Sequence, residues 1–171
     1  MAETQQNVGA LTDQEVKLLK DSWGILAEDK KTNGVKLFMK LFRRFSKAKE
    51  MFRMFKDKPL EALDYNGETT KTNYRMVAHG MSVMYALESY IDSLDDIYCL
   101  KELVRKTART HLDKGIGREQ FMWMIPAIHE LIDSVTEGRD NVDVDAVKKA
   151  WFTLMKLVAD LVESESRADN P

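Results

Sequence analysis

The sequence predicts an all-α protein with a single domain, and three observations support this. With 171 residues the chain is long enough for one full hydrophobic core and too short for two ordinary domains. Only three prolines and eight glycines interrupt it. Between them the apolar residues recur at every third or fourth position, which is the period of a helix with one buried face and not that of a strand. We therefore expect amphipathic helices around one core.

The first helix is expected to start directly after a flexible polar leader, residues 1–11. Thr12 followed by Glu15 has the spacing of a capping box, in which the two side chains bond free backbone N–H groups at a helix start. Residues 28–34 are expected to interrupt this helix before a second one covers 35–45. The helical period disappears in residues 56–70, which predicts a long loop with room for one short helix.

Four further helices are expected in the second half of the chain. A helix over 72–91 is followed by a break at 92–96, and the next helix ends where Gly115 can act as a C-cap. Two more amphipathic helices pass through 121–132 and 147–161. Residues 164–171 are expected to form a flexible tail, so the predicted domain covers residues 12–163.

The charge composition excludes two classes of partner. Lys and Arg number 26 against 28 Asp and Glu, a net charge of -2, so no global field draws the protein onto nucleic acid or an anionic membrane.

The first ten residues, MAETQQNVGA, lack the basic start and apolar run of a signal peptide. Cys99 is the only cysteine, which excludes an intramolecular disulfide and fits a reducing compartment. We expect a cytosolic protein.

Two of the three histidines carry the strongest functional signal. His79 and His111 each share the apolar stripe of a predicted helix, and their separation allows two neighbouring helices to present them from opposite sides of a flat cofactor. A haem iron needs this arrangement, with one imidazole bound to the metal and another facing the gas-binding position. The aromatic pair Phe52 and Phe55 would supply a flat apolar surface that excludes water. His129 lies off its helix stripe, so we expect it at the solvent or in an interface.

The sequence contains no motif of the common hydrolytic or phosphate-transferring enzymes. There is no Ser/His/Asp order, paired-carboxylate signature, Gly-rich phosphate loop or HExxH sequence. Each histidine taken alone is more often a core residue that satisfies its nitrogens locally, and much of the Phe and Met content must pack helices in any case. The joint pattern is the informative one.

Taken together, these segments resemble those of the globin family. In amino-acid sequence they are similar in particular to the intracellular haemoglobins of bivalve molluscs. The resemblance covers residues 11–162 and rests on Trp23 in the first helix followed by LFMKLF, FRMF, VAHGMSV and LVRKTARTHLDKGI. It implies a globin fold of about seven or eight helices around a pocket for haem b, iron protoporphyrin IX.

The resemblance also implies a role for each residue of the site. His111 is the proximal iron ligand, and His79 is the distal histidine and a candidate sixth ligand. Phe52 stacks on the porphyrin. Val83 lies over the iron one turn after His79, and Phe38 of the second helix covers the distal pocket.

The function that follows is a cytosolic b-type haem globin that binds O2 reversibly for storage, transport or facilitated diffusion, with CO and NO as further gaseous ligands. His79 would donate a hydrogen bond to the ligand, and the other N–H of His111 would bond a carbonyl or hydroxyl of its own helix. Alternatives are a haem enzyme that acts on NO, nitrite or peroxide, a redox or gas sensor in which His79 itself binds iron, and a helical interaction module without haem.

The resemblance to bivalve globins also implies a homodimer. Large apolar side chains that lie off the haem-facing stripes of the two helices would form the dimer interface. They are Tyr85, Tyr90, Ile97 and Tyr98. Cooperative clam dimers carry a mobile phenylalanine four residues before the proximal histidine, where this chain has Thr107. We therefore expect weak cooperativity or none.

Overall fold

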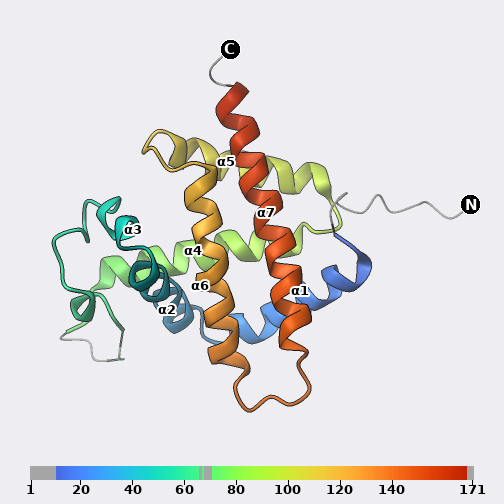
Figure 1. Cartoon of the computed structure of the whole chain (residues 1–171), viewed down its shortest axis with the longest axis horizontal. Coiled ribbons are helices and arrows are strands. Elements are labelled where there is room, and N and C mark those ends of the chain that lie inside the picture. The colour runs from blue at the N-terminus through green and yellow to red at the C-terminus, as the bar shows by residue number, and fades with distance from the viewer. Residues whose placement is uncertain (1–10, 66, 68–70, 169–171) are drawn as a thin grey trace, which may run out of the picture.

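The computed structural model describes residues 11–65, 67 and 71–168, and within them every regular element is helical. The elements are α1 (Asp13–Leu26), η1 (Ala27–Asp29), α2 (Lys30–Arg44), α3 (Ser46–Glu50), η2 (Leu60–Ala62), α4 (Tyr74–Asp92), α5 (Ile97–Leu112), α6 (Arg118–Thr136) and α7 (Val144–Ala168). In Figure 1, α6 and α7 run side by side while α4 crosses behind them and α2 lies against α4. The all-α prediction is confirmed.

The start of α1 agrees with the sequence prediction, and the expected interruption at 28–34 is confirmed in place but is shorter, because α2 already begins at Lys30. The Thr12 side chain accepts from the N–H of Glu15, whose carboxylate accepts from the N–H of Thr12, as a capping box requires. Only the three residues of η1 separate α1 from α2. Asp29 caps α2 by accepting from the N–H of Thr32 at 3.0 Å, and the amide of Asn33 bonds the last turn of α1 at the carbonyl of Leu26. These bonds let the helix restart almost at once.

Gly34 interrupts the sequence pattern because it is the point where α2 and α4 touch. A Cβ added at Gly34 would lie 2.6 Å from both the carbonyl carbon and the carbonyl oxygen of Gly80, and a Cβ at Gly80 would lie 2.7 Å from the carbonyl carbon of Gly34. Side chains cannot fit between two backbones at that distance. The glycine pair therefore sets the spacing of α2 and α4, and Gly80 follows His79 directly.

The described residues between α3 and α4 agree with the predicted long loop, and the short helix found among them is η2. Lys49 holds the start of this loop, because its ammonium group donates to the carbonyl oxygens of Phe55, Lys56 and Lys58 at 3.2, 2.6 and 2.8 Å. Phe55 is fully buried beneath that turn. The loop therefore begins with a turn that is held by hydrogen bonds from Lys49 and that places Phe52 and Phe55 against the core.

The predicted ends of the domain need correction at both sides. Leu11, assigned to the leader, is only 4% exposed and belongs to the core; residues 1–10 lie outside the described residues. The flexible tail predicted from residue 164 is wrong up to Ala168, because α7 continues to that residue. Glu165 is the physical reason, since its carboxylate pairs with Arg105 and Arg109 of α5 at 2.8 and 3.2 Å. Residues 169–171 lie outside the described residues.

In the described part of the chain, no helix combines the length and apolarity needed to cross a membrane.

Candidate functional site

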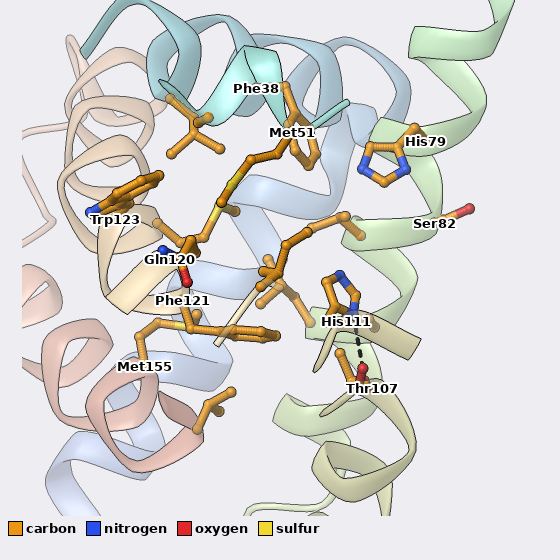
Figure 2. A pocket seen from close by; sticks show the side chains of 18 of the residues that line it. Phe38, Met51, His79, Ser82, Thr107, His111, Gln120, Phe121, Trp123 and Met155 are labelled. Carbon is orange, nitrogen blue, oxygen red and sulfur yellow. Dashed lines mark hydrogen bonds between the residues drawn. The ribbon is translucent and has the colours of Figure 1, made fainter. Parts of the chain in front are cut away.

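A cavity of about 260 Å³ lies where α2, α4, α5, α6 and α7 meet. Its walls are mostly apolar and include Phe38, Leu41, Val83, Leu87, Phe121, Trp123, Met124, Met155 and Val158. Exposed residues, among them Met51 and Ser82, also line it, so the cavity opens to the surface. Figure 2 shows His79 of α4 and His111 of α5 directed into this one space. The helices thus bring together the two histidines that the sequence singled out.

His111 presents a free ring nitrogen to the cavity. Its Nδ1 lies 2.8 Å from the carbonyl oxygen of Thr107, one turn earlier in α5, and 3.1 Å from Oγ1 of Thr110. A carbonyl oxygen can only accept a hydrogen bond, so Nδ1 carries the proton and Nε2 keeps its lone pair. The bond to a carbonyl of its own helix confirms that part of the prediction. Burial lowers the pKa of His111 despite this bond, so the ring is neutral at pH 7 and able to bind a metal.

Local chain geometry explains why His111 stands at this place. It lies in the last turn of α5, and the chain turns immediately afterwards through Gly115, whose φ of 73° falls in the left-handed region. The N–H of Ile116 then donates back to the carbonyl of His111 at 3.1 Å. Gly115 closes the helix as predicted. Phe121 of α6 packs on the imidazole, with ring centroids 5.3 Å apart.

His79 lies in an aromatic enclosure on the other wall. Its ring centroid is 4.7 Å from that of Phe38 and 5.0 Å from that of Phe52. The pKa of His79 is lowered to about 4, chiefly by burial and to a smaller extent by the charges of His111 and Lys114. His79 is therefore neutral at pH 7, with one N–H to donate and one lone pair to offer.

The remaining predicted residues do not all line the cavity. Phe38, Phe52 and Val83 do. Phe55 lies behind Phe52, with ring centroids 5.8 Å apart, and supports that ring without reaching the space itself. His129 is half-buried, and its Nε2–H donates to the carbonyl of Lys148 at 2.9 Å, so it joins α6 to α7 and lies away from the cavity.

Several lining residues were not singled out by sequence reasoning as part of the site. The prediction that Tyr90 lies off the haem-facing stripe, in a homodimer surface, is wrong: it is 3% exposed and lines the cavity. Its hydroxyl donates to Oγ1 of Thr107 at 2.6 Å. Helical spacing from His79 and Val83 could have placed Ala86 and Tyr90 on the same face. No sequence pattern marks Trp123 or Met51 as a site residue. They lie in α6 and directly after α3, and only the packing of the whole chain brings these segments to the cavity.

Comparison with known proteins identifies the family. The family model named Globin matches residues 35–162, which contain all six predicted site residues. The chain belongs to the globin family.

Mollusc globins are among its relatives. A globin of Buccinum undatum is 30% identical over 152 residues, which cover 87% of this chain and 97% of the relative. A globin of Busycotypus canaliculatus is 32% identical over 143 residues, or 82% of this chain and 90% of the relative. The Globin-2 B chain of Anadara inaequivalvis is 29% identical over 158 residues, or 92% of this chain and 96% of the relative. Globins bind haem and, through it, gaseous ligands such as O2.

The residues of the cavity fit a haem. A flat apolar macrocycle needs an apolar slot, and the walls provide one between α4 and α5. Its iron needs a neutral imidazole whose other nitrogen is held by an acceptor, and His111 has both properties. No group of three or more His, Cys, Asp or Glu side chains that could hold a bare metal ion occurs among residues 11–65, 67 and 71–168.

The depressed pKa of His79 predicts how the haem-free protein responds to acid. Between about pH 6.5 and pH 4 the unfolded chain binds a proton on this ring that the folded chain does not, so the free energy of unfolding falls as the pH falls. The loss from His79 should be about 2 kcal/mol at pH 5. Urea unfolding at pH 7 and pH 5 should therefore show a smaller pH effect in His79→Leu than in the unsubstituted protein. Equal pH effects in both proteins would contradict a buried, neutral His79.

Proposed function

We propose that this globin is cytosolic and binds O2 reversibly through a haem b that is held by His111 and faced by His79. The observation that carries the proposal is the protonation of His111, whose Nδ1–H donates to the carbonyl of Thr107 and leaves Nε2 free toward the cavity. When bound, the haem supplies a ferrous iron with one position for a diatomic gas. The protein residues then control what happens at that position.

His111 keeps its ring in one orientation and increases its basicity through the bond to Thr107. On the other wall, neutral His79 would donate a hydrogen bond to a gas held at that position, which would favour O2 over CO and slow autoxidation. Phe38, Phe52 and Val83 exclude water from this side. A mostly apolar wall with His79 as a polar donor suits a globin that binds its ligand and returns it unchanged.

Replacing His79 by leucine tests the distal role. The variant should keep its haem but release O2 faster, because a hydrogen bond to a charged partner contributes about 1.5 to 3 kcal/mol, equivalent to roughly 10- to 150-fold in rate. Autoxidation should accelerate as well, whereas CO dissociation should change much less. Stopped-flow O2 and CO displacement measures both rates. Equal effects on the two gases would contradict a donor role for His79.

Two alternatives use the same pocket and differ in their spectra or their reactions. In a redox or gas sensor the lone pair of neutral His79 would bind the iron, and the low pKa of this ring leaves that lone pair free. The visible spectrum of the ferrous deoxy form separates the cases, because two sharp bands indicate that His79 is a ligand and one broad band indicates an open position. A haem enzyme acting on NO, nitrite or peroxide would show rapid turnover with a reductant.

CO and NO as further ligands of the haem site stay a prediction. The homodimer also stays a prediction. Tyr85 and Tyr98 support it, because they are 51% and 73% exposed on α4 and α5. Tyr90 no longer does, since it is buried in the cavity wall. The small side chain of Thr107, bonded to Tyr90, leaves no mobile aromatic ring at this position to couple two subunits.

A further inference from the structure

Thr107 joins the two helices that carry the histidines. Its side chain accepts a hydrogen bond from the hydroxyl of Tyr90 in α4 at 2.6 Å and donates to the carbonyl of Leu103 at 3.2 Å. Its backbone carbonyl accepts from Nδ1–H of His111 at 2.8 Å and from the hydroxyl of Thr110 at 2.9 Å. Figure 2 shows Thr107 directly beside His111, with the bond between them dashed. One residue thus connects α4 to the imidazole that faces the cavity.

Tyr90 has the properties of an anchor for this residue. It is 3% exposed, and its ring is part of the cavity wall. Burial raises the pKa of Tyr90, so its hydroxyl stays protonated and remains a donor at neutral pH. A buried hydroxyl left without a partner is unfavourable, which by itself would explain a bond to any acceptor. The acceptor here, however, belongs to the residue that orients His111.

Ion pairs to α7 support α5 on a different face. Arg105 and Arg109 bind Glu165 of α7, so α7 restrains α5 from one direction only. The Tyr90 hydroxyl restrains it from α4, the helix that carries His79. Without that bond, the turn of α5 that holds Thr107 and His111 can shift relative to α4.

We propose that Tyr90 is a positioning residue for His111, acting through Thr107 to keep the Nδ1–H···O bond short. This inference rests on the proposed function, in which His111 binds the haem iron. A strong hydrogen bond from Nδ1–H makes an imidazole a stronger electron donor and stabilises the ferric state of the iron. Tyr90 therefore lowers the reduction potential of the protein and strengthens the iron–histidine bond from outside the set of ligands.

The test uses the full chain loaded with haem and compares Tyr90→Phe, Thr107→Val and the double variant. Each single change removes one partner of the inter-helix bond while keeping the shape of the side chain. We expect resonance Raman spectra of the ferrous deoxy form to show the iron–histidine stretch at lower wavenumber, and potentiometric titration to show a higher midpoint potential. The double variant should resemble either single variant, because both remove the same interaction.

Matched controls separate positioning from packing. Tyr74→Phe makes the same chemical change at a 55% exposed position of the same helix and should leave both readouts unchanged. Thr107→Ser keeps the hydroxyl and should retain the wild-type values. If Tyr90→Phe loses its haem, the comparison of Thr107→Ser with Thr107→Val decides the question by the same two readouts.

Two outcomes would overturn the inference: an unchanged stretch and potential in Tyr90→Phe and Thr107→Val, or additive shifts in the double variant. A lower melting temperature with both readouts unchanged would assign Tyr90 to packing alone. These results differ from a failure of the proposed function, which would appear in the unsubstituted protein as the absence of an iron–histidine stretch.

Discussion

Replacing His111 by alanine should abolish stable haem binding. The imidazole is the strong protein bond to the iron, and without it only burial of the porphyrin against the apolar walls remains. The purified variant should lack the Soret band or lose haem rapidly to apomyoglobin in a transfer assay. It should also melt at a lower temperature than the haem-loaded protein, because a ligand that binds only the folded state contributes about 4 kcal/mol at a concentration 1,000-fold above its dissociation constant.

His129→Ala is the matched control, because that ring bonds Lys148 between α6 and α7, away from the cavity. It should keep its haem even if it loses some stability. Added imidazole should restore a Soret band to His111→Ala by occupying the vacated position. If haem retention and the Soret position in His111→Ala matched those of the unsubstituted protein, His111 would not be the ligand.

Replacing Gly34 by alanine should destabilise the fold and disturb the distal wall. The new methyl carbon would lie 2.6 Å from backbone atoms of Gly80, which cannot rotate away as a flexible side chain can. α2 and α4 must then separate, which moves Phe38 relative to His79. We expect a loss of about 2 kcal/mol or more in the free energy of unfolding, from overpacking partly offset by the better helix propensity of alanine. Urea unfolding of the haem-free protein measures it.

Gly24→Ala makes the same change in α1, where a Cβ meets nothing within 4 Å. This control should be neutral or stabilise the protein by up to about 1 kcal/mol, since only the propensity term remains. Opposite signs for the two substitutions would show that close helix contact, and not glycine content, controls stability. A neutral Gly34→Ala would contradict the tight crossing of α2 and α4.

Some features of the fold and of the site follow from local pattern alone. The capping box at Thr12, the left-handed turn at Gly115 and the inward face of α4 depend on residues close in sequence, and each was predicted from its spacing. The histidine pair was found in the same way, because a polar residue on an apolar stripe must point inward. The bond from His111 to a carbonyl of its own helix is likewise local.

Errors arose where a distant residue decides the local structure. Gly34 looks like a break in the helical pattern, yet it lies within α2, where the absence of a side chain lets the backbone of α4 approach. Residues 164–168 look like a solvated tail, but the carboxylate of Glu165 is held by two arginines about 60 positions earlier in the chain. Tyr90 looks like surface bulk because nothing in the sequence marks Thr107 as its acceptor.

By itself the sequence determined the helical class and the two inward-facing histidines, because periodicity acts over one or two helical turns. The family was indicated by the resemblance of its motifs to those of globins, and the family model shows it. Only the tertiary structure decided that Phe55 supports Phe52 from behind, that Tyr90 and Trp123 line the cavity, and that Thr107 links both histidine-bearing helices. These contacts join residues on different helices. Their geometry depends on how closely whole helices pack, which no single segment encodes.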